Sequence, residues 1–161
     1  MPDRLALTLF NGRAGDHNDR AMAGGPLLAA ELADRLDLEP VTIGSPEPAL
    51  NTDWETELAA AMPALRQLTA RCEDVQAAGQ VPVTALSRCA VALATIPVVV
   101  QHHPDARVVW FDPHADLNTP ATTTELKQRW KCLRRIRLCP SRIGDIVAAG
   151  IVLSTLQRGN Y

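Results

Sequence analysis

Residues 108–116 read Val108-Val-Trp-Phe111-Asp112-Pro-His114-Ala-Asp116 and constrain the fold more than any other stretch. The apolar start predicts a buried parallel strand. In an extended segment alternate residues point to one side, so Asp112, His114 and Asp116 are expected to converge just beyond the end of that strand. Open α/β sheets bind their ligands at the carboxyl ends of strands. Two carboxylates and an imidazole there suit Mn²⁺ or Mg²⁺.

Upstream of this motif, strand patterns alternate with helix patterns. Four short apolar segments predict strands at Leu5–Phe10, Pro40–Ile43, Val81–Leu86 and Val108–Phe111. Alternation of this kind predicts a parallel, doubly wound sheet of the α/β class.

Helices are expected in the three intervals between these strands. Pro26 can open the first helix, which is expected to run to Asp37 with its leucines on one face. Thr52 or Asp53 can cap a helix from Trp54, which Pro63 is expected to break or restart before it ends near Ala77.

The third interval predicts a helix from Arg88 to about His103, capped by Ser87 and kinked at Pro97. His102 and His103 would then lie at the end of this helix, where an imidazolium interacts favourably with the helix dipole.

The segment from Trp110 to Thr124 resembles the Asp-x-His-x-Asp signature of the arginase/agmatinase (ureohydrolase) family, in its arginase version with Asn-Thr-Pro-x-Thr-Thr-Thr following. The resemblance covers residues 1–124 and implies the first part of a three-layer α/β/α fold with a two-manganese centre, here incomplete. It implies a hydrolase that releases urea from arginine or a related guanidino compound.

The resemblance also implies roles for individual residues. Asp112 would bridge the two metal ions, while His114 and Asp116 would each bind one of them. Asn118 and Thr123 match positions that grip the α-carboxylate of the substrate. The next residue of that loop, a serine in the family, is Glu125 here and repels a carboxylate.

Other family positions have diverged. The family places a metal-binding His in a Gly-Gly-Asp-His turn after the third strand, and the matching residues here are Leu86-Ser-Arg-Cys89. A thiolate suits Mn²⁺ poorly, so Cys89 is interpreted as a buried helix residue, with metal binding as the alternative. We find no match downstream to the family's Ser-x-Asp-x-Asp ligands or to its catalytic His, and we therefore assign no catalytic residue. Gly15-Asp-His17 follows the first strand and is interpreted as a polar loop.

The charge pattern divides the chain at residue 124. Residues 1–124 carry eight Arg, no Lys and sixteen acidic residues, whereas residues 125–161 carry eight basic and two acidic residues. We predict an arginase-like part at 1–124 and a basic tail of divergent sequence at 125–161. The tail either has a partner of its own or arises from a change of reading frame near codon 124, and we favour the frameshift.

Composition narrows the remaining classes. The chain has 161 residues, of which 47% are apolar, enough for one domain. Its start shows no signal-peptide pattern and its apolar runs are too short to span a bilayer, so we expect no membrane association. The four cysteines lack Cys-x-x-Cys spacing, which favours reduced thiols and a cytoplasmic location. Lys127–Arg137 could contact nucleic acid or an anionic membrane, but many solvated helices have the same pattern and nucleic-acid binding is not the expectation.

Two hypotheses on function remain. One is a manganese-dependent amidinohydrolase by ancestry, impaired or inactive in this chain. The other is a non-catalytic remnant that acts as a binding or assembly module. In either case Val108–Phe111 would be an apolar edge strand unless the tail covers it, which predicts self-association.

Overall fold

The computed structural model describes residues 4–15, 17, 19–106 and 109. Within these residues the chain forms three strands, β1 (Leu5–Phe10), β2 (Val41–Ile43) and β3 (Val81–Ala85). Three α-helices accompany them, α1 (Gly24–Leu36), α2 (Trp54–Ala77) and α3 (Ala92–His102), with short 3-10 helices η2 (Asp19–Ala21) and η3 (Cys89–Val91). The expected strand at Val108–Phe111, apart from Val109, and the tail at 125–161 lie outside the described residues.

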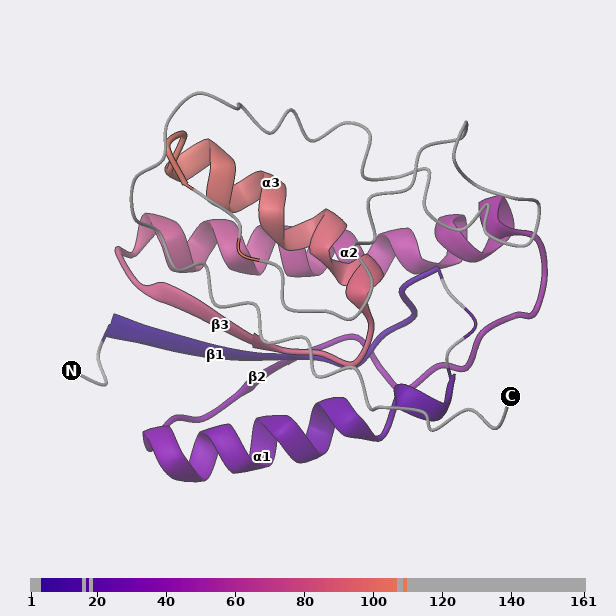
Figure 1. Ribbon diagram of the computed structural model, residues 1–161, viewed down its shortest axis with the longest axis horizontal. Coiled ribbons are helices and arrows are strands. Elements are labelled where there is room, and N and C mark those ends of the chain that lie inside the picture. The colour runs from indigo at the N-terminus through magenta and orange to yellow at the C-terminus, as the bar shows by residue number, and fades with distance from the viewer. Residues whose placement is uncertain (1–3, 16, 18, 107–108, 110–161) are drawn as a thin grey trace.

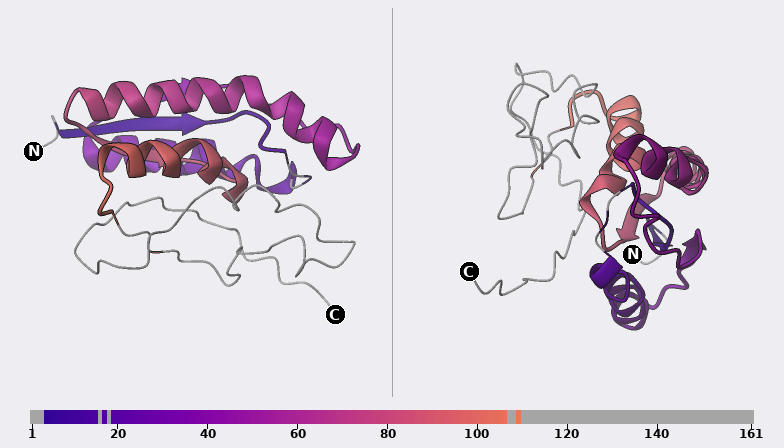
Figure 2. Two further views of the ribbon diagram at one scale, coloured as in Figure 1. Left: turned by 90° about the horizontal axis from the view of Figure 1, so that it is seen from above. Right: turned by 90° about the vertical axis from the view of Figure 1, so that its right-hand side faces the viewer.

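The sheet is parallel, as the alternating pattern predicted, and its strand order is β2-β1-β3. Thr8 of β1 pairs with Val41 of β2 on one side and with Thr84 of β3 on the other. Helix α1 covers one face of the sheet, and α2 and α3 lie together over the other (Figure 1). The right-hand view of Figure 2 shows the same order, with α1 on one side of the strands and α2 and α3 on the other. The three-layer α/β/α architecture is therefore confirmed for the described part.

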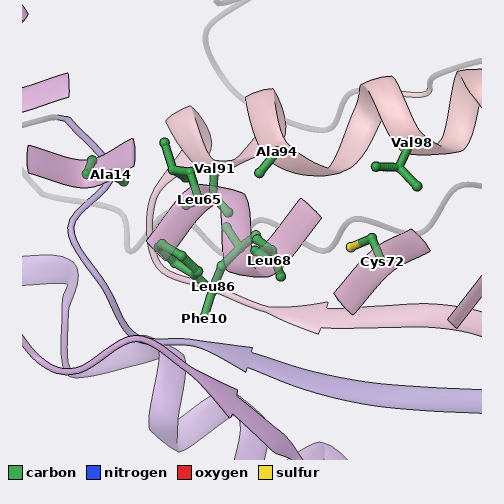
Figure 3. Packing of buried hydrophobic residues seen from close by; sticks show 10 residues of the cluster. Phe10, Ala14, Leu65, Leu68, Cys72, Leu86, Val91, Ala94 and Val98 are labelled. Carbon is green, nitrogen blue, oxygen red and sulfur yellow. The ribbon is translucent and has the colours of Figure 1, made fainter. Parts of the chain in front are cut away.

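The central strand is buried on both faces because helices cover both. Leu9 packs on the α1 side with Ala29, whereas Phe10 packs on the other side with Leu68. Figure 3 shows Phe10 and Leu68 within a cluster from β1, α2 and α3 that also includes Val91 and Val98. A strand covered on both faces reads as a continuous apolar run, which explains the sequence of β1.

Helix α2 corrects one expectation, since Pro63 lies inside a continuous helix of 24 residues. Proline removes one backbone donor and costs about 3 kcal/mol in a helix interior. The buried stripe formed by Ala61, Leu65, Leu68, Cys72 and Val75 holds the helix on both sides of the proline. Burial of that stripe outweighs the local cost, so the helix does not break.

The helix ends follow the sequence with small shifts. Asp53 caps α2 as expected, its Oδ1 accepting the N–H groups of Glu55 and Thr56. Ser87 does not cap the next helix, because η3 intervenes and α3 begins at Ala92 without a side-chain cap. Pro97 lies inside α3, and His103 follows its end as predicted.

Candidate functional site

Three loops meet at the carboxyl edge of the sheet, one from each strand. The loop after β1 leads through η2 to α1, the loop after β2 leads to α2, and the segment after β3 leads through η3 to α3. Arg13 of the first loop binds the second, donating to Oε2 of Glu47 at 2.7 Å and to the carbonyl oxygen of Pro48 at 2.8 Å. Two further carboxylates, the half-exposed Asp19 and the buried Glu57, connect these segments.

Asp19 joins all three segments. Its Oδ1 accepts the N–H of Ala49 at 2.8 Å and lies 3.1 Å from Nη2 of Arg88. The Arg88 side chain is 2% exposed and that of Asp19 is 38% exposed. A buried charge is tolerated when it is paired, so the Asp19 carboxylate both stabilises the Arg88 guanidinium and anchors the loop that carries Ala49.

Glu57 is a buried carboxylate in the first turn of α2. Its two oxygens accept the N–H groups of Leu50 and Thr52, each at 3.2 Å, and Oε1 lies 3.2 Å from Nε2 of His17. Burial raises the pKa of this carboxyl, but the backbone donors of Leu50, Thr52 and Asn51, together with His17, favour the charged form and leave the pKa below its usual value. His17 thus contacts a buried acid rather than only lining a polar loop.

Cys89, which the sequence analysis matched to a metal-binding His of the family, lies in η3 immediately after Arg88. Its side chain is half-buried, so the expectation of a buried helix residue is correct for the helical turn and wrong for full burial. The match to the metal-binding His is still a prediction, and the residue next to this thiol in sequence is the buried cation Arg88. Within the described residues no group of three or more His, Cys, Asp and Glu side chains could hold a metal ion.

The residues that we predicted to bind metal and substrate lie outside the described part of the chain. Asp112, His114 and Asp116, and the substrate-binding candidates Asn118 and Thr123, are therefore still predictions. Two histidines with no assigned role are described. His103 follows α3 with Nε2 3.1 Å from Oε1 of Gln76, and His102 is exposed in the last turn of α3.

The sequence analysis missed three residues of the polar network, namely Asp19, Glu57 and Arg88. Arg88 carried a signal, because an arginine directly after an apolar strand and before an apolar helix has little access to water unless the chain turns outward. Asp19 and Glu57 carried none, since an acid in a loop or in a first helical turn is ordinarily solvated. Asp19 is 69 positions from its partner Arg88 in the sequence, and Glu57 is 40 positions from its partner His17.

The parallel strands, the helices on both faces of the sheet and the loops gathered at the carboxyl ends of the strands define a doubly wound α/β protein. The sequence profile of the arginase family matches residues 21–153, so the chain belongs to the arginase family, a family of hydrolases. This match runs past residue 124, where we placed the change in sequence. No helix of the described residues is long and apolar enough to cross a membrane.

Individual relatives agree with the family. The chain is 33% identical over 119 residues to an N(omega)-hydroxy-L-arginine amidinohydrolase of Streptomyces lavendulae, covering 74% of this chain and 44% of the relative. It is 56% identical over 32 residues to the mitochondrial arginase-2 of Rattus norvegicus, covering 20% of this chain and 9% of that protein. Human arginase-1 is 34% identical over 61 residues, covering 38% of this chain and 19% of its own length. The chain thus spans less than half the length of these relatives.

Proposed function

We propose that this chain descends from a manganese-dependent amidinohydrolase that releases urea from arginine or a related guanidino compound, and that as it stands it has little or none of that activity. The lineage is supported by the family match and by the Asp112, His114 and Asp116 motif. Asn118 and Thr123 would contact the α-carboxylate of a guanidino amino acid by the same resemblance. The amidinohydrolase of Streptomyces lavendulae is a relative with such a substrate in its name.

The proposed loss of activity rests on one observation, which is the positive charge of Arg88 at the end of β3. The family's manganese would need an oxygen or nitrogen ligand there, and this chain offers the half-buried thiol of Cys89 beside the buried guanidinium of Arg88. The donors present do not fit Mn²⁺ at this position. Asp112, His114 and Asp116 have suitable donor chemistry, but by the family pattern they are divided between two ions and would leave each under-coordinated. We therefore derive no reaction step for this chain.

The alternative function is a binding or assembly module without catalysis. It is favoured by the described part of the chain, in which residues of β1, α2, η3 and α3 form a hydrophobic core with one another. Such a module needs no metal. In this alternative the apolar edge predicted at Val108–Phe111 would recruit a second copy of the chain.

Location and further partners are also proposals. We place the protein in the cytoplasm on the basis of its cysteine usage and expect no membrane or nucleic-acid partner. Self-association can be measured by light scattering over a range of concentrations. A strictly monomeric chain at high concentration would argue against the exposed edge.

The deciding experiment is manganese content per folded chain after incubation with Mn²⁺ and desalting, combined with a urea-release assay on arginine and N-hydroxyarginine. We expect little retained manganese and no urea above background. Two ions per chain with urea release would show that the tail or a second subunit supplies the missing ligands, and would overturn the proposed loss of activity. Metal without urea release would favour the binding module.

A further inference from the structure

The end of β3 holds a positive charge inside the protein. The Arg88 side chain is 2% exposed, and its Nη2 lies 3.1 Å from Oδ1 of Asp19. The same oxygen accepts the N–H of Ala49. One cation from the segment after β3 therefore orients an acid after β1, and that acid anchors the loop after β2.

The ion pair of Arg88 and Asp19 joins the segments that follow two neighbouring strands of the sheet, β3 and β1. Strand β1 is central, and the chain leaves it toward α1 on one face, whereas it leaves β3 toward α3 on the other face (Figure 1). The carboxyl edge between two such strands is a topological switch point, where doubly wound sheets bind ligands. In this chain Arg88 and Asp19 bridge the two diverging segments at that edge.

We propose that the Arg88 guanidinium is an internal cation that stands in for a bound metal ion at the end of β3. It neutralises Asp19 and holds the three loops together, so this edge neither needs nor binds a divalent cation. A divalent ion next to Asp19 would be repelled by the Arg88 guanidinium, which lies 3.1 Å from Oδ1 of Asp19. The next residue in the sequence, Cys89, offers a thiol instead of a hard oxygen. The claim that manganese does not bind at the end of β3 rests on the proposed function. The role of Arg88 in holding the three loops together does not.

The first test is Mn²⁺ binding to the full chain, measured by calorimetry with Mn²⁺ alone. If Cys89 or Asp19 were a ligand, Cys89→Ser or Asp19→Asn would weaken binding by at least the roughly 10–100-fold seen when an outer-shell partner is lost. We expect the wild-type titration to be unchanged in both variants, whether the wild type binds manganese elsewhere or not at all. A tenfold or greater loss in either variant would overturn the proposal.

A separate arm tests the proposed function. Asp116→Asn lowers Mn²⁺ binding only if the downstream motif holds an ion, and its result does not bear on Arg88. The two proposals can thus fail independently. As a further control, any difference in the thermal unfolding midpoint between EDTA and Mn²⁺ should be the same in the wild type and in Cys89→Ser. A rise with Mn²⁺ that Cys89→Ser abolishes would contradict the internal cation.

The second test measures whether Arg88 and Asp19 act as a unit. Arg88→Met and Asp19→Asn should each lower the urea midpoint of unfolding. The midpoint of the double variant should lie only slightly below that of the less stable single variant. The exchange of the Ala49 amide hydrogen should become faster in each variant. Arg88→Lys keeps the charge but loses the planar guanidinium, so it should keep part of the protection of the Ala49 amide hydrogen. This variant replaces Arg88→Met in the test if Arg88→Met does not fold.

A matched control is the pair Arg35 and Glu31 on the surface of α1, whose side chains are 72% and 59% exposed. Arg35→Met and Glu31→Gln should have small and nearly additive effects, because exposed pairs of this spacing contribute little. Additive effects of the Arg88 and Asp19 substitutions, or an unchanged exchange rate at Ala49, would show that the buried pair is not the anchor that we propose.

Discussion

Nε2 of His17 lies 3.2 Å from Oε1 of Glu57, a carboxylate whose side chain is 1% exposed. The contact joins the loop after β1 to the first turn of α2 across 40 positions of sequence. Because Glu57 also accepts the backbone N–H groups of Leu50 and Thr52, one buried acid determines the course of two loops. Its removal should be felt well beyond its own helix.

We expect Glu57→Ala to lower the free energy of unfolding by about 1–3 kcal/mol, because it removes the charged acceptor of two part-buried backbone hydrogen bonds. Glu55→Ala is the matched control, since Glu55 is an exposed acid in the same helical turn. Urea unfolding followed by circular dichroism measures both. Equal losses in the two variants would show that the network around Glu57 contributes nothing specific.

The same residue predicts how stability depends on pH. The pKa of Glu57 is lowered in the folded protein, so the folded state favours the charged carboxylate. The stability that results is fully present above the pKa of the unfolded chain and is lost as the pH falls through the folded pKa. Asp53, whose pKa is lowered chiefly by the Thr56 N–H, acts in the same direction.

Glu57→Gln should therefore flatten the decline of stability between about pH 5 and pH 2, where lowered carboxyl groups titrate. Unfolding midpoints measured across this range test the prediction. If stability fell as steeply with decreasing pH in Glu57→Gln as in the wild type, the pH dependence would come from other groups.

The core between the sheet and its two-helix layer should tolerate no truncation. Leu68 is fully buried against Phe10 and Val91, and Leu68→Ala should cost about 2–5 kcal/mol through lost transfer energy and a residual cavity. Leu27 on α1 is 72% exposed, and Leu27→Ala should change the free energy of unfolding by about 0.5 kcal/mol or less. A comparable effect at both leucines would mean that the surface of α1 is covered in solution.

Two glycines with positive φ separate backbone strain from steric conflict. At Gly44, with φ of 80°, an added Cβ would lie 2.9 Å from Cα of Gly12. Gly79 has φ of 70° but nothing within 4 Å of such an atom. Gly79→Ala should cost about 1–2 kcal/mol for the left-handed backbone, and Gly44→Ala should cost clearly more. Thermal unfolding of the two variants measures the difference.

Cys72 should resist alkylation in the folded protein. Burial raises the pKa of its thiol to about 11, and the side chain is 3% exposed, so little thiolate is present and reagents have little access. Pulse labelling with a maleimide, followed by peptide mass spectrometry, should find Cys89 modified well before Cys72. Rapid labelling of Cys72 under native conditions would show that α2 opens locally.

The local elements followed from the sequence where one signal dominated. The apolar run of β1 predicted a strand, and Asp53 before Trp54 predicted the start of α2. Pro63 shows the limit of local reasoning, since a helix breaker was outweighed by the buried stripe on which it sits. The family resemblance likewise came from a short motif in which residue types and spacing match together, and the profile match confirmed it.

The succession of strands and helices, the doubly wound parallel class and the arginase family could be predicted from the sequence, because these depend on periodicity, turn residues and a contiguous motif. The burial of Arg88 against Asp19 and the contact between Glu57 and His17 could not. Those contacts join residues 69 and 40 positions apart. No local pattern encodes such pairs, since only folding brings the three carboxyl-edge loops together and buries the side chains of Arg88 and Glu57.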